Sequence, residues 1–315
     1  FINNLYLLIV GIFLMRFSGQ GLMSHTSTTT ISRYFDKRRG KALSTVWFGL
    51  SSAEFILPVL IIFLLSFLSW RLIWQIISIT MIIILPVVIF LTIKDISIES
   101  RESNDNNIFT SSYNKIKSWK RSEVLKDYKF YIISLNMLAM PWIATGVFVY
   151  QSFISESKLW NIYTIPKSFM IYSIASILTL ILSGLLVDKF SSRKLILYIN
   201  IPLLIGLFLI YFFNDPIIAY IFFGLVGISN GLSNVLGSST WAEIYGVKYL
   251  GSIKALTTAL MVFSTAFGSA IFGYFIDIGL TIEIISLISA VYIISVFALM
   301  LIISNKINPI IIEKA

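Results

Sequence analysis

Residues 34–43 read YFDKRRGKAL and separate two apolar segments, each long enough to cross a lipid bilayer. Apolar side chains are unfavourable in water over that length, and the charges at positions 36–39 and 41 are unfavourable in lipid. This segment is therefore predicted to be a turn at a membrane surface. Because Lys and Arg are enriched in cytoplasmic loops, we place the turn on the cytoplasmic side. The side of every other loop follows by counting crossings from it.

The composition agrees with a membrane protein and excludes several other classes. The 315-residue chain is 57% hydrophobic and only 12% charged, which is typical of a polytopic α-helical membrane protein. The net charge of +9 comes from cations in alternate loops, so nucleic acid is not an expected partner. The chain has no Cys, and we find no catalytic triad, metal-ligand spacing or ATP-binding loop. We therefore expect no enzyme activity, no cofactor and no metal.

Nine membrane-spanning helices are predicted, each from an apolar run of about 20 residues. Of the 24 Lys and Arg residues, 20 then fall on the cytoplasmic side, three fall on the opposite side and Arg16 lies inside a span. The positive-inside rule requires an unequal distribution of this kind. A wrong number of spans in the middle of the chain would place the Lys and Arg residues on both sides. The predicted spans are residues 4–33, 42–67, 70–93, 129–153, 165–187, 195–213, 216–241, 253–275 and 281–304.

The spans fall into two groups around a polar connection at 94–128, which is predicted to be a cytoplasmic linker. Three spans precede it, in residues 1–93, and six follow, in residues 129–315. A weak internal repeat supports this division, because three positions recur 211 residues later with the same order and sidedness of spans. Two parallel halves are a known transporter design, so three further spans are expected before Phe1. The matching positions are Thr29 and Thr240, Tyr34 and Tyr245, and Gly40 and Gly251.

Two segments carry recognisable motifs. Residues 16–21 (RFSGQG) contain an Arg followed by Gly-x-Gly, and residues 184–194 read GLLVDKFSSRK. They resemble the fourth-span motif and the G-x-x-x-D-[RK]-x-G-R-[RK] loop motif of the major facilitator superfamily, with Ser191 at a position where that family usually has Gly. The resemblance covers spans four to twelve of that fold. It implies an all-α membrane protein of two six-helix halves, the first of them incomplete here.

Two other segments resemble particular branches of that superfamily. Residues 34–39, with Ala42 and Gly49, resemble a signature of monocarboxylate transporters. Residues 241–251 (WAEIYGVKYLG) resemble bacterial relatives of the oxalate–formate antiporter group.

The resemblance implies a secondary active transporter in the plasma (inner) membrane. It is expected to move a small solute, with an organic anion as a candidate, by alternating access. A proton or a counter-substrate is the expected coupling partner. The alternative is a transport-like membrane sensor or receptor, which binds its ligand without moving it.

Arg16 and Glu54 are charged residues predicted to lie deep inside the first two spans. A charge at membrane depth is unfavourable and usually faces a cavity or a partner of opposite sign. Counted from the cytoplasmic ends of their helices, the two lie at similar heights, close enough for an ion pair. Two interpretations are open. Either Arg16 attracts an anionic substrate, with Glu54 as its partner or as a proton carrier, or the two form a permanent structural pair.

Polar residues near Arg16 extend this candidate site along the first span. Gln20 and Ser24 follow Arg16 at four-residue spacing, so they share its helix face and are predicted to point toward the bundle or a cavity. His25, the only histidine, lies about 100° away from Ser24 around the helix. It is a candidate for coupling transport to protons near neutral pH, and the alternative is a hydrogen bond to a neighbouring helix.

Two spans of the second half supply the other candidates for substrate contact. In the first of them, residues 129–153, Pro141 is predicted to kink the helix. Tyr150 lies near the outer boundary of this span, and its alternative role is that of an interfacial anchor. In the span 216–241 the two candidates lie one turn apart, and interhelical hydrogen bonding is their alternative role. These candidates are Asn136, Trp142, Tyr150 and Gln151 in the first of these spans, and Asn230 and Asn234 in the second.

The last group of polar residues is predicted to lie at the cytoplasmic surface, away from the substrate. By resemblance to the superfamily, Asp188 lies against the helix that begins near Gly40, where the positive end of the helix dipole favours an anion. Such a contact is expected to stabilise the outward-facing state and to break on inward opening. A solvated loop without that role is the alternative. The predicted gating residues are Asp188, Arg193, Gly40 and Glu243, and Lys254 is placed at the same surface.

Overall fold

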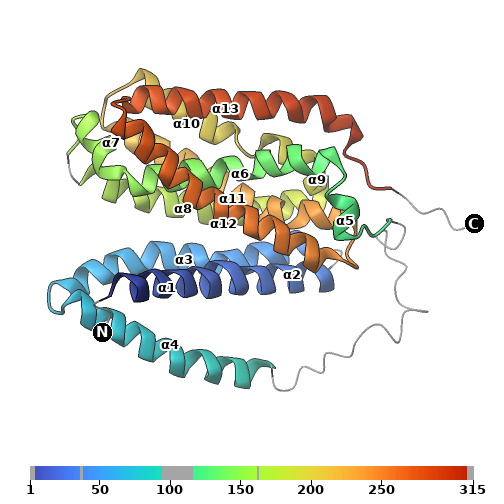
Figure 1. Cartoon of the computed structure of the whole chain (residues 1–315), viewed down its shortest axis with the longest axis horizontal. Coiled ribbons are helices and arrows are strands. Elements are labelled where there is room, and N and C mark those ends of the chain that lie inside the picture. The colour runs from blue at the N-terminus through green and yellow to red at the C-terminus, as the bar shows by residue number, and fades with distance from the viewer. Residues whose placement is uncertain (1–3, 36–37, 94–115, 162, 311–315) are drawn as a thin grey trace, which may run out of the picture.

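The computed structural model describes residues 4–35, 38–93, 116–161 and 163–310, in which the regular elements are all helices (Figure 1). The side chains at positions 20, 33, 34, 58, 59, 62, 92 and 93 lie outside the described part as well. The greater part of the predicted linker, residues 94–115, also lies outside it.

The first half of the chain forms three long helical segments. One continuous rod consists of α1 (Leu5–Met15), a π-helix (Arg16–Met23) and α2 (Ser24–Tyr34). It is followed by α3 (Arg39–Leu65) and α4 (Trp70–Ile93). The sequence predicts a regular first helix, and the π-helix is a departure from it. Two glycines within eight residues weaken the preference for an α-helix there, and π-helical turns occur frequently at functional sites.

The second half begins with a short segment that packs against the end of the chain. Lys117 N donates to the Ile310 carbonyl at 2.8 Å, and α5 (Arg121–Val124) follows. The backbone N–H of Lys120 and the ammonium of Lys117 lower the pKa of the Glu123 carboxyl. The remaining helices are α6 (Tyr128–Val149), α7 (Gln151–Ser157), α8 (Thr164–Phe190), α9 (Ser192–Leu195), a 3-10 turn (Ile196–Tyr198), α10 (Ile201–Phe212), α11 (Ile217–Tyr245), α12 (Leu250–Asp277), α13 (Ile282–Ile303) and a second 3-10 turn (Ser304–Lys306).

Eight segments of the described residues are long and apolar enough to cross a membrane, judged by length and composition. They coincide with eight of the nine predicted spans. The remaining predicted span, 42–67, corresponds to α3. This arrangement confirms the all-α, polytopic membrane fold. The eight segments are Leu5–Ser32, Trp70–Leu91, Tyr128–Val149, Thr164–Phe190, Ser192–Phe212, Ile217–Tyr245, Leu250–Asp277 and Ile282–Lys306.

The buried core lies mainly in the second half, where α8 and α11 pack closely along their length. Two glycines of α11 allow this approach. A Cβ at Gly227 would overlap the Tyr172 carbonyl, and one at Gly231 would lie 2.8 Å from the Ser176 carbonyl oxygen. Small residues bring membrane helices together in this way. In the first half, α4 lies apart from the other helices in Figure 1, and nearly all of its described side chains are exposed.

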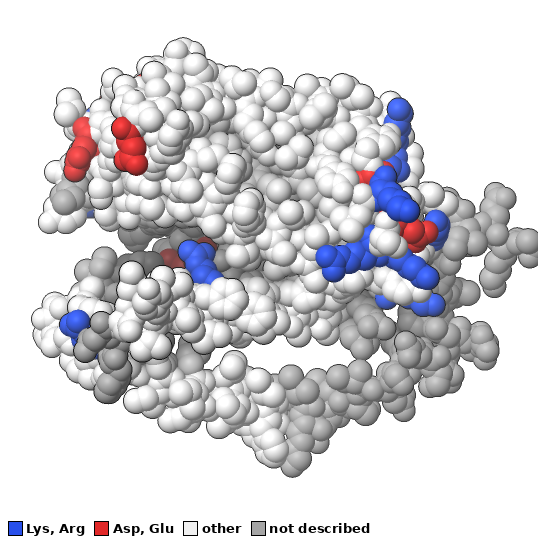
Figure 2. Space-filling model, viewed as in Figure 1, with Lys and Arg blue, Asp and Glu red and all other residues white. Residues whose placement is uncertain are grey.

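The two ends of the bundle differ in charge (Figure 2). The turns between α2 and α3, α8 and α9, and α11 and α12 lie at one end, where Lys and Arg side chains gather; we call this the basic end. The other end, which we call the opposite end, holds the turns after α3, α7 and α10.

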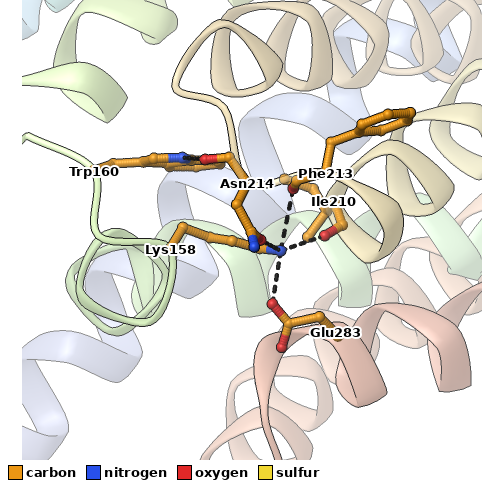
Figure 3. A network of polar contacts seen from close by, with 6 residues as sticks. All are labelled: Lys158, Trp160, Ile210, Phe213, Asn214 and Glu283. Atoms are coloured by element: carbon orange, nitrogen blue, oxygen red, sulfur yellow. Dashed lines mark hydrogen bonds and ion pairs between the residues drawn. The ribbon is translucent and has the colours of Figure 1, made fainter.

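A buried lysine joins three segments at the opposite end of the second half (Figure 3). The side chain of Lys158 is fully buried, and its Nζ lies 2.6 Å from Glu283 Oε1 at the start of α13. The same ammonium donates to the Ile210 carbonyl at 2.6 Å, the Asn214 side chain at 2.7 Å and the Phe213 carbonyl at 3.2 Å. The end of α10 and the start of α13 are therefore fixed to the segment after α7. Lys158 is one of the three cations predicted on the side opposite the cytoplasm, and nothing in the sequence indicated this burial.

Candidate functional site

A cavity of about 480 Å³ lies between the two halves. Its volume falls in the range of small-molecule binding sites. In Figure 2 the molecule is hollowed between the halves at the end opposite the basic one, and an acidic and a basic side chain lie in that hollow. Side chains of α6, α8, α11 and α12 line it from the second half. The lining residues of the first half are Arg16, Ser24, Thr28, Trp47, Leu50 and Glu54.

Three charged side chains line this cavity, namely Arg16, Glu54 and Lys254. Arg16 is exposed and extends from the first residue of the π-helix, whereas Glu54 is partly buried in the middle of α3. Oxygen Oε2 of Glu54 is buried and has no hydrogen-bond partner among the described residues. The shared cavity agrees with the prediction that these two residues face one site.

Several of the other predicted residues also reach the cavity. Asn230 and Asn234 line it from α11, and Pro141 and Thr145 line it from the middle of α6. Asn230 Nδ2 donates to Ser176 Oγ at 3.1 Å. A polar path therefore links this wall of the cavity to α8.

The three polar residues predicted to extend the site from Arg16 are placed differently by the structure. Ser24 lines the cavity two turns beyond Arg16, as the predicted polar stripe requires. The side chain of Gln20 lies outside the described part. His25 is not a lining residue; its Nδ1 is buried and has no hydrogen-bond partner among the described residues.

The structure does not place Asn136 and Trp142 at the cavity, although both are predicted substrate contacts. Asn136 is 2% exposed; its Nδ2 donates to the Ile196 carbonyl at 2.8 Å, and its Oδ1 accepts from Asn200 at 3.0 Å. Trp142 packs edge-on against Tyr292 and Phe272, with ring centroids 5.4 and 6.1 Å apart. Both side chains fix α6 to neighbouring helices of the same half.

Tyr150 and Gln151 also lie away from the cavity. The Tyr150 hydroxyl lies against Gly273 of α12, where a Cβ would overlap it. Gln151 begins α7 at the opposite end of the bundle. The predicted span 129–153 treated these residues as one helix, whereas α6 ends at Val149 and Gln151 begins the separate helix α7.

At the basic end, α3 and α8 close the gap between the halves. Asp188 Oδ1 accepts from the Gly40 backbone N–H at 2.9 Å, and Oδ2 accepts from the Lys41 N–H at 3.3 Å. This is the contact that the resemblance implied, an anion at the positive end of a helix dipole. The two helices also cross at a pair of glycines, because a Cβ at Gly184 would lie 2.9 Å from the Gly40 carbonyl oxygen and 2.7 Å from Ser44 Oγ. We call these contacts the α3–α8 clamp.

Glu243 and Arg193 make contacts inside the second half instead. The Glu243 carboxylate accepts from the backbone N–H groups of Ser192 at 3.0 Å and Arg193 at 3.2 Å, and from the Ser191 hydroxyl. Arg193 Nη1 donates to Asn308 Oδ1 at 3.0 Å. Ser191 has φ = 73°, a conformation that glycine adopts more easily, which accounts for the usual Gly at this position. Glu243 thus holds the turn after α8 in place.

Lys254 is the main residue that sequence reasoning misplaced. It is only 4% exposed and lines the cavity, so its assignment to the cytoplasmic surface was wrong. Counting it with the loop cations ignored its position five residues inside α12. A signal was present in the sequence, because Thr257, Thr258 and Met261 follow Lys254 at helical spacing and line the same wall.

The comparison with known proteins agrees with this architecture. A family model described as the Major Facilitator Superfamily matches residues 1–166, more than half of the chain. The chain belongs to the major facilitator superfamily. A search of curated proteins finds no match.

Membership of this superfamily makes the chain a multi-pass membrane transporter with a small-molecule substrate, and members are typically transporters rather than enzymes. The matched range includes the motif at 16–21 and the turn at 34–43, and ends early in α8. Most of α8 and the helices α10 to α13 follow the matched range, and α8, α11 and α12 supply part of the cavity lining.

Proposed function

We propose that this transporter is a secondary transporter that moves a small organic anion through the cavity by alternating access. The observation that carries the proposal is the cavity itself, which lies between the halves and is lined by two cations, Arg16 and Lys254, and one acid, Glu54. With all three groups ionised, this set has an excess positive charge that an anionic solute balances.

The two ends of the cavity support alternating access. The α3–α8 clamp closes the basic end, while the hollow in Figure 2 lies toward the opposite end. This arrangement corresponds to an outward-facing state if the basic end is cytoplasmic, as the positive-inside rule predicts. Inward opening then requires Asp188 to leave the start of α3, which makes Asp188 and Gly40 gating residues.

Within this proposal, Arg16, Asn230 and Asn234 contact the solute from the two halves. Glu54 is the proposed proton carrier, because it is the acid among the cavity-lining residues and its buried Oε2 has no hydrogen-bond partner among the described residues. His25 lies outside the cavity lining and would act only through neighbouring residues. Small carboxylates are the first substrates to test, since residues 34–49 and 241–251 resemble monocarboxylate and oxalate–formate transporters. The plasma (inner) membrane is the proposed location.

The test is counterflow of radiolabelled carboxylates into proteoliposomes that are preloaded with the same unlabelled compound. We expect transient accumulation of label with the unchanged protein and with Arg71→Ala, because Arg71 is exposed on α4 and stacks on Trp70, away from the cavity. Arg16→Ala should reduce the initial rate about 10- to 100-fold, the factor that corresponds to loss of a charged hydrogen bond.

Unchanged kinetics in Arg16→Ala would contradict the role of Arg16. Binding of a carboxylate without any exchange would contradict transport and would favour a sensor.

A further inference from the structure

Lys254 combines burial, charge and position in a way that the proposed function does not explain. Its side chain lines the cavity from α12, close to the basic end of that helix. It is 96% buried, since only 4% of its surface is exposed. Its Nζ has no hydrogen-bond partner among the residues that the structure describes. A buried ammonium is unfavourable unless it is paired with an anion or a hydrogen-bond acceptor.

The acid that shares the cavity does not fill this role. Glu54 Oε2 and Lys254 Nζ both lack hydrogen-bond partners among the described residues, so this oxygen and this nitrogen are not bonded to each other. Within the described ranges, no carboxylate is hydrogen-bonded to Lys254.

Other hydrogen-bond donors that line the cavity are also buried without a hydrogen-bond partner among the described residues. Trp47 Nε1 from α3 and the hydroxyls of Ser233 from α11 and Ser134 from α6 line the cavity, are buried, and have no partner in the described part of the chain. These donors come from both halves. Indole N–H groups can only donate, so Trp47 requires an acceptor.

We propose that Lys254, together with Trp47 and Ser233, binds the carboxylate group of a small organic anion in the cavity. The inference rests on the proposed function and names the groups that recognise its substrate. An anion supplies the acceptor that each of these donors lacks. Because Trp47 belongs to the first half and Lys254 and Ser233 to the second, the bound anion joins the two halves. Binding at this point therefore favours the state in which the halves are close together.

The experiment measures ligand-dependent thermal unfolding of the purified full-length protein in lipid nanodiscs. The probes are acetate, succinate and inorganic phosphate at constant ionic strength. We expect a carboxylate to raise the unfolding temperature in a concentration-dependent manner, because a ligand that binds only the folded state stabilises it. Lys254→Gln should weaken this binding about 10- to 100-fold, and Lys254→Arg should restore part of it. Lys248→Gln removes an exposed lysine six residues earlier and should leave the binding unchanged.

A second readout separates binding from a structural role. Without ligand, Lys254→Gln should unfold at the same or a higher temperature than the unchanged protein, since it removes a buried charge that lacks a partner. A lower unfolding temperature combined with an intact response to carboxylates would overturn the proposal. Stabilisation of the unchanged protein by phosphate alone, or by none of the three probes, would also overturn it.

Counterflow in parallel distinguishes this inference from the proposed function. Carboxylate binding that is lost in Lys254→Gln, with no counterflow in the unchanged protein, would support the site and contradict transport. Counterflow that persists unchanged in Lys254→Gln would support transport and contradict the site.

Discussion

Two buried lysines of the second half differ in whether the protein supplies partners for the buried ammonium group. Lys158 Nζ has four partners within 3.2 Å, including the carboxylate of Glu283. Lys254 Nζ, which is nearly as well buried, has none among the described residues and faces the cavity. A charge that the protein has fully paired stabilises the fold. A charge that it leaves unpaired beside a cavity is available to a ligand.

The largest effect should come from breaking the paired lysine. Lys158→Gln leaves Glu283 without its cation and removes the ammonium from the last turn of α10. We expect the free energy of unfolding to fall by about 3 kcal/mol, the lower part of the range for a broken buried pair, because the Glu283 side chain is 30% exposed. Chemical denaturation in a mild detergent measures this change. The control is Lys167→Gln, an exposed lysine at the same end, which should change little. Equal destabilisation by Lys158→Gln and Lys254→Gln would remove the distinction between the two lysines.

The two lysines lie within one half, whereas the α3–α8 clamp joins the two halves. Substitutions in the clamp should therefore change the equilibrium between the closed and open basic end more than the stability of the fold. Gly184→Val places a side chain against Gly40 and Ser44, where even a Cβ lies within 2.9 Å of both. Overpacking of this kind typically costs about 1–3 kcal/mol, so the clamped state should become about 5- to 150-fold less favoured. Gly49→Ala is the control, because its Cβ would meet nothing within 4 Å.

The chain has no Cys, so the opening of the basic end can be followed with one cysteine introduced at Ser44 in the Gly184→Val and Gly49→Ala backgrounds. Its labelling by a thiol reagent should accelerate only with Gly184→Val. Equal labelling rates in both variants would contradict a clamp at this crossing.

A smaller shift is expected from Asp188→Asn. The amide retains the shape of the side chain but loses the charge at the start of α3, which contributes about 1 kcal/mol to such a contact. Labelling of the same cysteine should therefore increase about fivefold. Asp277→Asn, at an exposed acid near the end of α12, should have no effect. If Asp188→Asn behaves like Asp277→Asn, the Asp188 contact does not control the basic end.

The smallest effect is predicted within the turn after α8. Ser191→Gly relieves a positive-φ residue but removes the hydroxyl that donates to Glu243. Both terms are about 1 kcal/mol and oppose each other, so the unfolding temperature should hardly change. Ser191→Ala loses the hydrogen bond without relieving the backbone and should unfold at a lower temperature. Identical behaviour of the two variants would show that the backbone conformation contributes nothing.

The sequence predicted much of the fold because lipid imposes strict rules on length and charge. Apolar runs and alternating basic loops located the spans, and local motifs indicated the contact between Asp188 and the start of α3. The cavity residues were less predictable. Hydropathy does not tell which face of α6 meets another helix, so Asn136 and Trp142 were assigned to the cavity although they pack within one half.

Lys254 shows a second limit. A lysine near a loop contributes equally to a charge count whether its side chain points to water or into the protein. Only the stripe of polar residues that follows it along α12 carries that information, and it becomes meaningful once the neighbouring helices are known.

Accessibility of the cavity tests the central claim most directly. Ser233→Cys places a single thiol in the cavity of a chain that has no other cysteine. In oriented vesicles, a membrane-impermeant maleimide should label it from the side opposite the basic loops, and a transported carboxylate should slow that labelling. In the Gly184→Val background, labelling should also occur from the basic side. Simultaneous labelling of the unchanged background from both sides, or from neither, would contradict a cavity that opens alternately between two halves.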